Sequence, residues 1–310
     1  MAQDQITLSQ AIEGYFIYAH ARRLSPQTLD NYDWGLQKLE AYLKDDPPFA
    51  AITTAQIRAF LNSLHHLSNR SLINVRSGMS ALWTWGVHEG LVPHNIVKDT
   101  EAPKPEKRDV IPFTQRELQL LLSACDRAKA YRRPGKRLCD NKRPTALRDR
   151  AIVILLLDTG IRASELCDLT LADADLTNHR IVVIGKGRKQ RHIPISPRTE
   201  QAIWRYLTTR DDKKPTASLF TTSTGRALNR FNLWRLLKLA GERAGVDGAH
   251  PHRFRHTFAI TFLRNGGNVF ALQRILGHES LSMVNKYLAI AQTDLEQAHI
   301  DASPVTNWRL

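Results

Sequence analysis

A charged, proline-containing segment at residues 100–112 is the feature that most constrains how this chain can fold. Pro103, Pro105 and Pro112 stand among charged side chains there, and prolines spaced in this way interrupt helices and strands. We therefore predict a first domain at 1–100, a linker at 101–112, a second domain at 113–292 and a tail at 293–310. A length of 310 residues suits two domains better than one.

Apolar residues recur at helical spacing through the first domain. The pattern predicts four helices, which begin near Leu8, at Ser25-Pro26, at Thr53 or Thr54, and near Asn69. The fourth helix sets Arg70 and Asn74 on a face away from its apolar residues. In the second domain a β-hairpin at 180–195 interrupts a series of helices. The predicted fold class is therefore mainly α with a small β-sheet.

The positive charge of the chain is unevenly distributed. The net charge is +14, yet residues 1–105 carry nine basic and ten acidic side chains, so the whole excess lies in the rest of the chain. This excess favours a polyanionic partner, with nucleic acid the first candidate. The densest basic run contains an expected loop at 129–144, which is either a phosphate contact or a solvated loop. Its candidate DNA-contacting residues are Arg132, Arg133, Lys136 and Arg137.

Several classes of protein are disfavoured by composition. No apolar run is long enough to cross a bilayer, and no secretory signal is evident at the N-terminus. The three cysteines have no metal-like spacing, and the glycine pattern of a nucleotide-binding loop is missing. We therefore expect a cytoplasmic protein without a membrane partner, a metal or another cofactor.

Four short segments carry residues suited to phosphate chemistry. They are Thr159–Leu166 with Arg162, the turn Gly185-Lys186-Gly187, the run from His252 to His256, and Leu276-Gly277-His278 followed after nine residues by Tyr287. In this order they resemble the catalytic set of the tyrosine recombinase, or phage integrase, family. The resemblance covers nearly the whole chain and implies a helical, SAM-like core-binding domain followed by a mixed α/β catalytic domain.

The resemblance also implies a role for each of six residues. Arg162 and Arg255 would bind the scissile phosphate, which suits guanidinium groups because they are planar, charged and bidentate. His252 and His278 would bond the phosphate and assist proton transfer, and Lys186 would be the general acid. Tyr287 would be the nucleophile, although a phenol with a pKa of ~10 needs a proton acceptor or electrostatic help. The product would be a 3′-phosphotyrosyl enzyme, so religation needs neither ATP nor metal.

Other residues are assigned supporting or DNA-binding roles. Glu165 matches an acidic position of the family, and it either orients active-site groups or caps its helix. We interpret His256 as a packed neighbour of Arg255 rather than a catalytic residue. Beside the hairpin turn, Arg188, Lys189 and Arg191 are either phosphate contacts or solvated residues. Arg70 and Asn74 are the DNA-contacting candidates of the first domain.

The family resemblance implies a double-stranded DNA partner with paired inverted-repeat core sites. It implies a tetrameric synapse, a Holliday junction intermediate and a tail exchanged between protomers with Trp308 as a candidate anchor, and it leaves room for an accessory directionality protein. The two-domain layout is Xer-like, whereas the loop at 129–144 favours a mobile-element enzyme. A type IB topoisomerase is an alternative that the short spacing from His278 to Tyr287 disfavours. A catalytically silent DNA-binding architectural protein is a second alternative, disfavoured by the full set of six residues.

Overall fold

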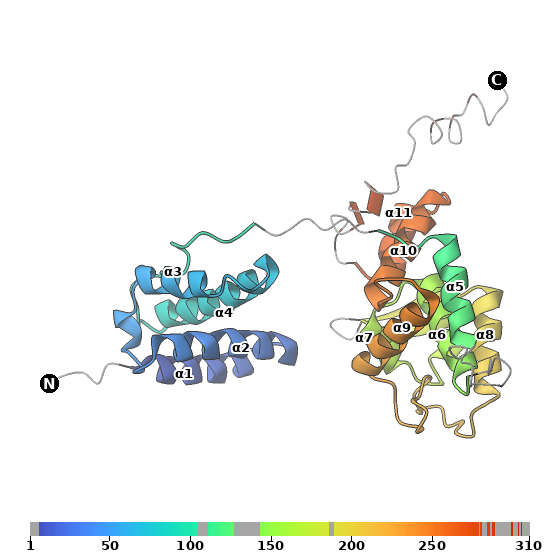
Figure 1. Ribbon diagram of the computed structural model, residues 1–310, viewed down its shortest axis with the longest axis horizontal. Coiled ribbons are helices and arrows are strands. Elements are labelled where there is room, and N and C mark those ends of the chain that lie inside the picture. The colour runs from blue at the N-terminus through green and yellow to red at the C-terminus, as the bar shows by residue number, and fades with distance from the viewer. Residues whose placement is uncertain are drawn as a thin grey trace, which may run out of the picture. The chain divides into compact units, whose positions relative to one another are not determined.

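The chain divides into two compact units, Met1–Arg108 and Asp109–Leu310, which are described separately (Figure 1). The computed structural model describes residues 6–104, 111–126, 143–185, 189–278, 280, 284–285, 287–288, 299, 303 and 305. The described residues are mainly helical with one small sheet, which confirms the predicted fold class. None of the described helices has the length and apolarity needed to cross a membrane.

Within residues 6–104, the first unit contains four α-helices and a short 3-10 turn. They are α1 (Leu8–Ala21), α2 (Pro26–Leu43), η1 (Phe49–Ala51), α3 (Thr54–Ser63) and α4 (Asn69–His88). Each α-helix begins after a Ser or Thr whose side chain accepts a hydrogen bond from a first-turn backbone N–H: Thr7, Ser25, Thr53 and Ser68. Such caps satisfy donors that a helix start leaves unpaired, so the helix starts follow directly from the sequence.

The core of the first unit forms where α4 packs against α1 and α2. Trp83 is 1% exposed, and its ring centroid lies 4.8 Å from that of Phe49. Trp83 is therefore a core residue of the first unit. Arg70 and Asn74 are exposed on α4, as the helical pattern predicts.

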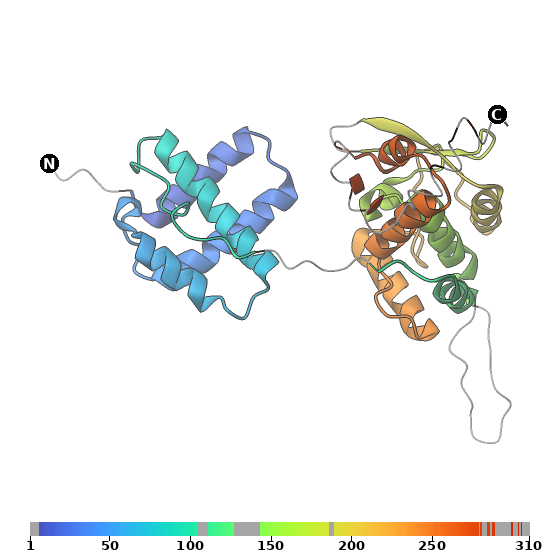
Figure 2. The same ribbon diagram turned by 90° about the horizontal axis from the view of Figure 1, so that it is seen from above.

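The second unit is built around a buried helix, α6 (Ala146–Thr159), which packs against α5, α8 and α10 (Figures 1 and 2). Its buried residues face more than one side, as expected for a helix without a polar face. The surrounding helices are α5 (Gln115–Asp126), α7 (Ala163–Asp168), α8 (Pro197–Leu207), α9 (Arg230–Ala244), α10 (Pro251–Arg264) and α11 (Val269–Leu276). Val284, Asn285, Tyr287 and Leu288 are also helical.

The sheet of the second unit has three antiparallel strands in the order β1-β2-β3. The predicted hairpin is formed by β2 (Arg180–Ile184) and β3 (Gln190–Pro194), with Ile181 opposite Ile193. A third strand, β1 (Ala174–Asp175), was not predicted, because two residues are too short for an alternating pattern. The backbone N–H of Gly185 donates to the Lys189 carbonyl at 2.8 Å, so the pairing of the two strands extends to Gly185 and Lys189.

Part of the predicted basic run is committed to ion pairs inside the second unit. Arg143 and Arg148 both bind the fully buried Asp149, at 2.8 and 2.7 Å, and Arg150 binds Asp126 at 3.0 Å. Arg150, and Arg143 through the Cys125 carbonyl, connect α6 and the residues before it to α5, whereas Arg148 pairs within α6. The other candidates of the run, Arg132, Arg133, Lys136 and Arg137, lie outside the described residues.

Candidate active site

The C-terminal end of α11 gathers three arginines that are far apart in the sequence. Arg191 Nε donates to the Ile275 carbonyl at 2.9 Å, and Arg255 Nη2 donates to the Leu276 carbonyl at 2.8 Å. Arg162 Nη2 lies 3.4 Å from the next carbonyl, that of Gly277. The last carbonyls of a helix lack partners within it and carry partial negative charge, so they attract cations. The helix end therefore concentrates positive charge at one place.

A buried carboxylate, that of Glu165 in α7, fixes two of these arginines. Arg191 binds it with both terminal nitrogens, at 2.9 and 2.8 Å, and Arg162 binds it with Nη1 at 3.0 Å. The backbone N–H of Arg162 also donates to Glu165, at 2.8 Å. Burial alone would raise the pKa of Glu165. The hydrogen bonds from Arg191 and Arg162, together with their charges, outweigh burial and lower it.

Arg255 is deeply buried and bound to His278. Its guanidinium donates to the Gly160 carbonyl at 2.8 Å and to His278 Nε2 at 2.8 Å. Since a guanidinium can only donate, His278 Nε2 must accept, and the neutral ring carries its proton on Nδ1. Burial and the charges of Arg255, Arg162 and Arg191 lower the pKa of His278 to about 4, which keeps it neutral. Its Nδ1 is buried without a hydrogen-bond partner among the described residues.

Tyr287 lies beside His278 and is 6% exposed. The two rings are stacked, with an interplanar angle of 10° and centroids 6.3 Å apart. The Tyr287 hydroxyl lies 2.9 Å from Nδ1 of His256. Burial raises the pKa of Tyr287, and the charges of Arg255 and Arg162 oppose that shift without cancelling it. The phenol is therefore protonated at neutral pH.

The structure brings most of the predicted site residues together. Arg255, His278, Tyr287 and His256 contact one another in series. The pair Arg162–Glu165 joins them in one cluster at the end of α11, where Arg162 and Arg255 approach successive carbonyls. His252 lies at the start of α10, where partial burial and the charges of Arg255 and Arg162 lower its pKa. Lys186, the predicted general acid, lies outside the described residues.

Two residues occupy environments that the sequence did not predict. Arg191 was expected to contact a phosphate or to lie in solvent. Its side chain is only 15% exposed, and its guanidinium binds the Glu165 carboxylate and the Ile275 carbonyl instead. His256, interpreted as a packed neighbour, contacts the hydroxyl of Tyr287. Its position four residues after His252 on α10 is the one sequence signal that it shares a face with the site.

The remaining DNA-contacting candidates are not part of this cluster. Lys189 is exposed next to the hairpin turn, and Arg70 and Asn74 belong to the first unit. Arg188 lies outside the described residues.

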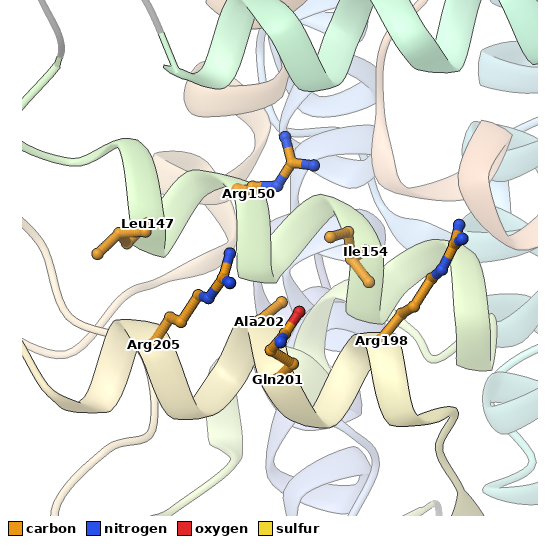
Figure 3. Close-up of a pocket in the computed structure, with 7 residues that line it drawn as sticks. All are labelled: Leu147, Arg150, Ile154, Arg198, Gln201, Ala202 and Arg205. Atoms are coloured by element: carbon orange, nitrogen blue, oxygen red, sulfur yellow. The ribbon is translucent and has the colours of Figure 1, made fainter.

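A separate groove between α6 and α8 is lined by three arginines (Figure 3). Its lining consists of Leu147, Arg150, Ile154, Arg198, Gln201, Ala202 and Arg205. No residue of the tyrosine cluster lines this groove, so it is a separate place on the second unit.

Comparisons with known proteins agree with this arrangement. A profile of the phage integrase family matches residues 112–294, and one of the phage integrase N-terminal SAM-like domain matches residues 12–90. The chain is 30% identical over 311 residues to tyrosine recombinase XerC of Alcanivorax borkumensis, covering 98% of this chain and 97% of that protein. It is also 30% identical to tyrosine recombinase XerD of Corynebacterium glutamicum, covering 91% of this chain and 94% of that protein.

Solved structures support the fold. The Tn1549 transposon integrase in complex with a circular intermediate DNA gives a TM-score of 0.75 at 20% identity, covering 96% of this chain and 99% of that one. A lambda integrase dimer bound to a COC' core site gives a TM-score of 0.72 at 21% identity, covering 89% and 97%.

A helical unit with a small sheet that matches the phage integrase family over residues 112–294 indicates a DNA strand-exchange enzyme. The chain belongs to the phage integrase family, and it is a tyrosine recombinase, an enzyme that cleaves and rejoins DNA.

Proposed function

We propose that this recombinase cleaves one DNA strand with Tyr287 and conserves the bond as a 3′-phosphotyrosyl linkage. The observation that carries the proposal is the position of Tyr287, stacked on His278, which is bound to Arg255. A nucleophile, a neutral imidazole and a guanidinium are thus held side by side.

The charge at the end of α11 supports a phosphate at this place. A phosphodiester attacked in line develops negative charge on its non-bridging oxygens, which Arg162 and Arg255 would stabilise. The Nδ1–H of His278, which has no hydrogen-bond partner among the described residues, would donate to one of those oxygens, and this bond would remove the cost of its burial. His252 would bind the phosphate from the exposed side. Lys186 would give its proton to the 5′-oxygen that leaves.

Double-stranded DNA is the proposed partner, read at paired inverted-repeat core sites by a tetramer that passes through a Holliday junction. The proposed tail exchange, the anchor Trp308, an accessory directionality protein and the cytoplasmic location stay predictions. The division into a core-binding domain at 1–100, a linker, a catalytic domain at 113–292 and a tail is likewise part of the proposal.

The exposed face of α9 is an additional candidate for DNA contact. Phe231 and Trp234 are 67% and 45% exposed, and the Lys238 ammonium lies 5.2 Å from the Trp234 ring centroid. Arg235 is exposed on the same helix. Basic and aromatic side chains that alternate on an exposed helix suit a contact with phosphates and bases.

A trapping experiment tests the nucleophile. A pool of nicked duplexes with randomised core sequence lets the cleaved fragment diffuse away, so the enzyme stays attached to DNA. We expect a denaturant-resistant protein–DNA adduct with the natural chain and none with Tyr287→Phe, while both bind DNA equally. An adduct formed by Tyr287→Phe would overturn the assignment.

A further inference from the structure

We propose that His256 is a catalytic residue that accepts the proton of the Tyr287 hydroxyl as the phosphotyrosyl bond forms. The proposal rests on the proposed function of Tyr287 as the nucleophile and names the group that activates it. Its observation is the contact of 2.9 Å between the Tyr287 hydroxyl and His256 Nδ1.

The neighbours of the hydroxyl leave few routes for its proton. Tyr287 is 6% exposed, so bulk water has little access to it in this state. Arg255 faces the phenol but has only N–H donors, so it cannot take the proton.

His278 is also unsuited to take the proton. Its Nε2 lone pair already accepts a hydrogen bond from Arg255, and its Nδ1 carries a hydrogen. Its ring lies nearly parallel to that of Tyr287, at 10°, so its in-plane nitrogens do not point at the phenol. The His256 ring is tilted at 52° to Tyr287, and its Nδ1 lies within hydrogen-bonding distance of the hydroxyl.

The need for an acceptor follows from the environment of Tyr287. Burial raises the pKa of Tyr287, so the side chain is a neutral phenol rather than a phenolate before the attack. Arg255 and Arg162 favour the charged form and would stabilise negative charge as the proton leaves. The charges that act on the phenol are those of Arg255 on α10 and Arg162 before α7, while burial acts against them and raises the pKa of Tyr287. Burial therefore keeps the phenol protonated at rest, and the two cations stabilise the negative charge that develops when the proton leaves.

The step balances in protons and charge. The hydroxyl proton of Tyr287 passes to His256 Nδ1, which becomes part of an imidazolium. The Tyr287 oxygen forms a bond to phosphorus as the bond from phosphorus to the 5′-oxygen breaks. That oxygen takes a proton from Lys186, so the diester keeps its single negative charge. Religation reverses both transfers, and His256 returns the proton to the tyrosine oxygen.

The test separates proton acceptance from packing. Asparagine places a polar atom near the position of Nδ1 but cannot accept a proton, so His256→Asn should fold and bind DNA normally. We expect single-turnover adduct formation on the nicked-duplex pool to slow by about 100-fold or more, the range of general acid–base catalysis. His179→Asn is the matched control, because His179 is an exposed residue of the same unit at φ 52, a conformation that asparagine tolerates. It should cleave at the natural rate.

Two chemical substitutions assign each proton. Replacing Tyr287 with a difluorotyrosine of lower phenol pKa should restore much of the rate lost in His256→Asn and little of that lost in Lys186→Ala. A 5′-bridging phosphorothiolate, whose thiolate leaving group needs no proton, should restore Lys186→Ala and not His256→Asn.

The outcomes distinguish the inference from the proposed function. An adduct with Tyr287→Phe overturns the nucleophile and the inference together. If Tyr287→Phe is inactive but His256→Asn cleaves at the natural rate, the inference alone is wrong. A slow His256→Asn that difluorotyrosine does not restore makes His256 a packing residue and also overturns it.

Discussion

At the scale of single residues, Glu165 controls how the arginines are held. It is 5% exposed, and removing one partner of a buried ion pair typically costs 3–5 kcal/mol. We expect Glu165→Gln to lower the free energy of unfolding of the second unit by about 3 kcal/mol at pH 7, since Arg191 loses its bidentate partner. Glu165→Asp is the control that keeps the charge and should lose less. Chemical denaturation measures both, and an unchanged Glu165→Gln would contradict the assigned contact.

The same residue predicts a pH dependence. The pKa of Glu165 is lowered in the folded state, so its contribution is fully present above the unfolded value of about 4.3. It is lost as pH falls through the lower folded pKa, where the folded carboxylate also becomes protonated. The difference in unfolding free energy between the natural chain and Glu165→Gln should therefore shrink at acid pH. A difference that stays constant from pH 7 to pH 3 would refute the charged pair.

Sequence could predict the residues of the site far better than their contacts. Arg162, Arg255, His278 and Tyr287 were singled out because their order and spacing resemble a family, and they lie together. The contacts of Arg191 and His256 could not be predicted, because they depend on side-chain direction after folding. A hairpin residue that turns inward to a carboxylate on α7 looks, in sequence, like one that faces solvent.

At the scale of elements, the end of α11 depends on a glycine. Gly277 ends the helix at φ 63, and a Cβ there would lie 3.0 Å from Arg191 Nη1. Gly245 ends α9 at φ 64 with nothing within 4 Å of its Cβ position. Gly245→Ala should cost about 1 kcal/mol of stability from backbone strain alone. Gly277→Ala should cost more and should also slow cleavage, because Arg191 must move. Thermal unfolding and adduct formation check the pair, and equal losses would exclude displacement of Arg191.

The elements themselves were largely predictable. A capping side chain followed by proline at the first helical position predicts a helix start, as at Ser25-Pro26 and His250-Pro251. The short elements α7 and β1 have no such capping residue or first-position proline to mark where they begin. α7 has only 6 residues, and its start depends on Glu165 bonding back to the Arg162 backbone.

At the scale of the whole molecule, the two units bury separate cores. Trp83 lies in the first and Ile152 in the second, each almost fully buried. We expect denaturation to show two transitions, with Trp83→Ala shifting one and Ile152→Ala the other, each by about 3 kcal/mol. Calorimetry measures this directly. A shift of both transitions together in either variant would show that the units unfold as one.

The uneven charge predicts how DNA binding depends on salt. Binding should weaken steeply as salt rises, with a slope set by the number of phosphates neutralised. Arg143, Arg148 and Arg150 are paired internally, so we expect them to contribute little. Replacing Arg132, Arg133, Lys136 and Arg137 with glutamine should reduce the slope by about 1 for each phosphate that is no longer neutralised. An unchanged slope would show that these four residues do not neutralise DNA phosphates.

The first described residues of the second unit, 111–113, are attached to α10. Arg253 binds Glu117 at 2.8 Å and covers the Phe113 ring at 3.9 Å, while Thr257 accepts the Phe113 backbone N–H at 2.8 Å. These contacts fix the start of the second unit to α10, the helix that also carries Arg255 and His256. A displacement of residues 111–113 would therefore act directly on α10, whose His256 contacts the Tyr287 hydroxyl.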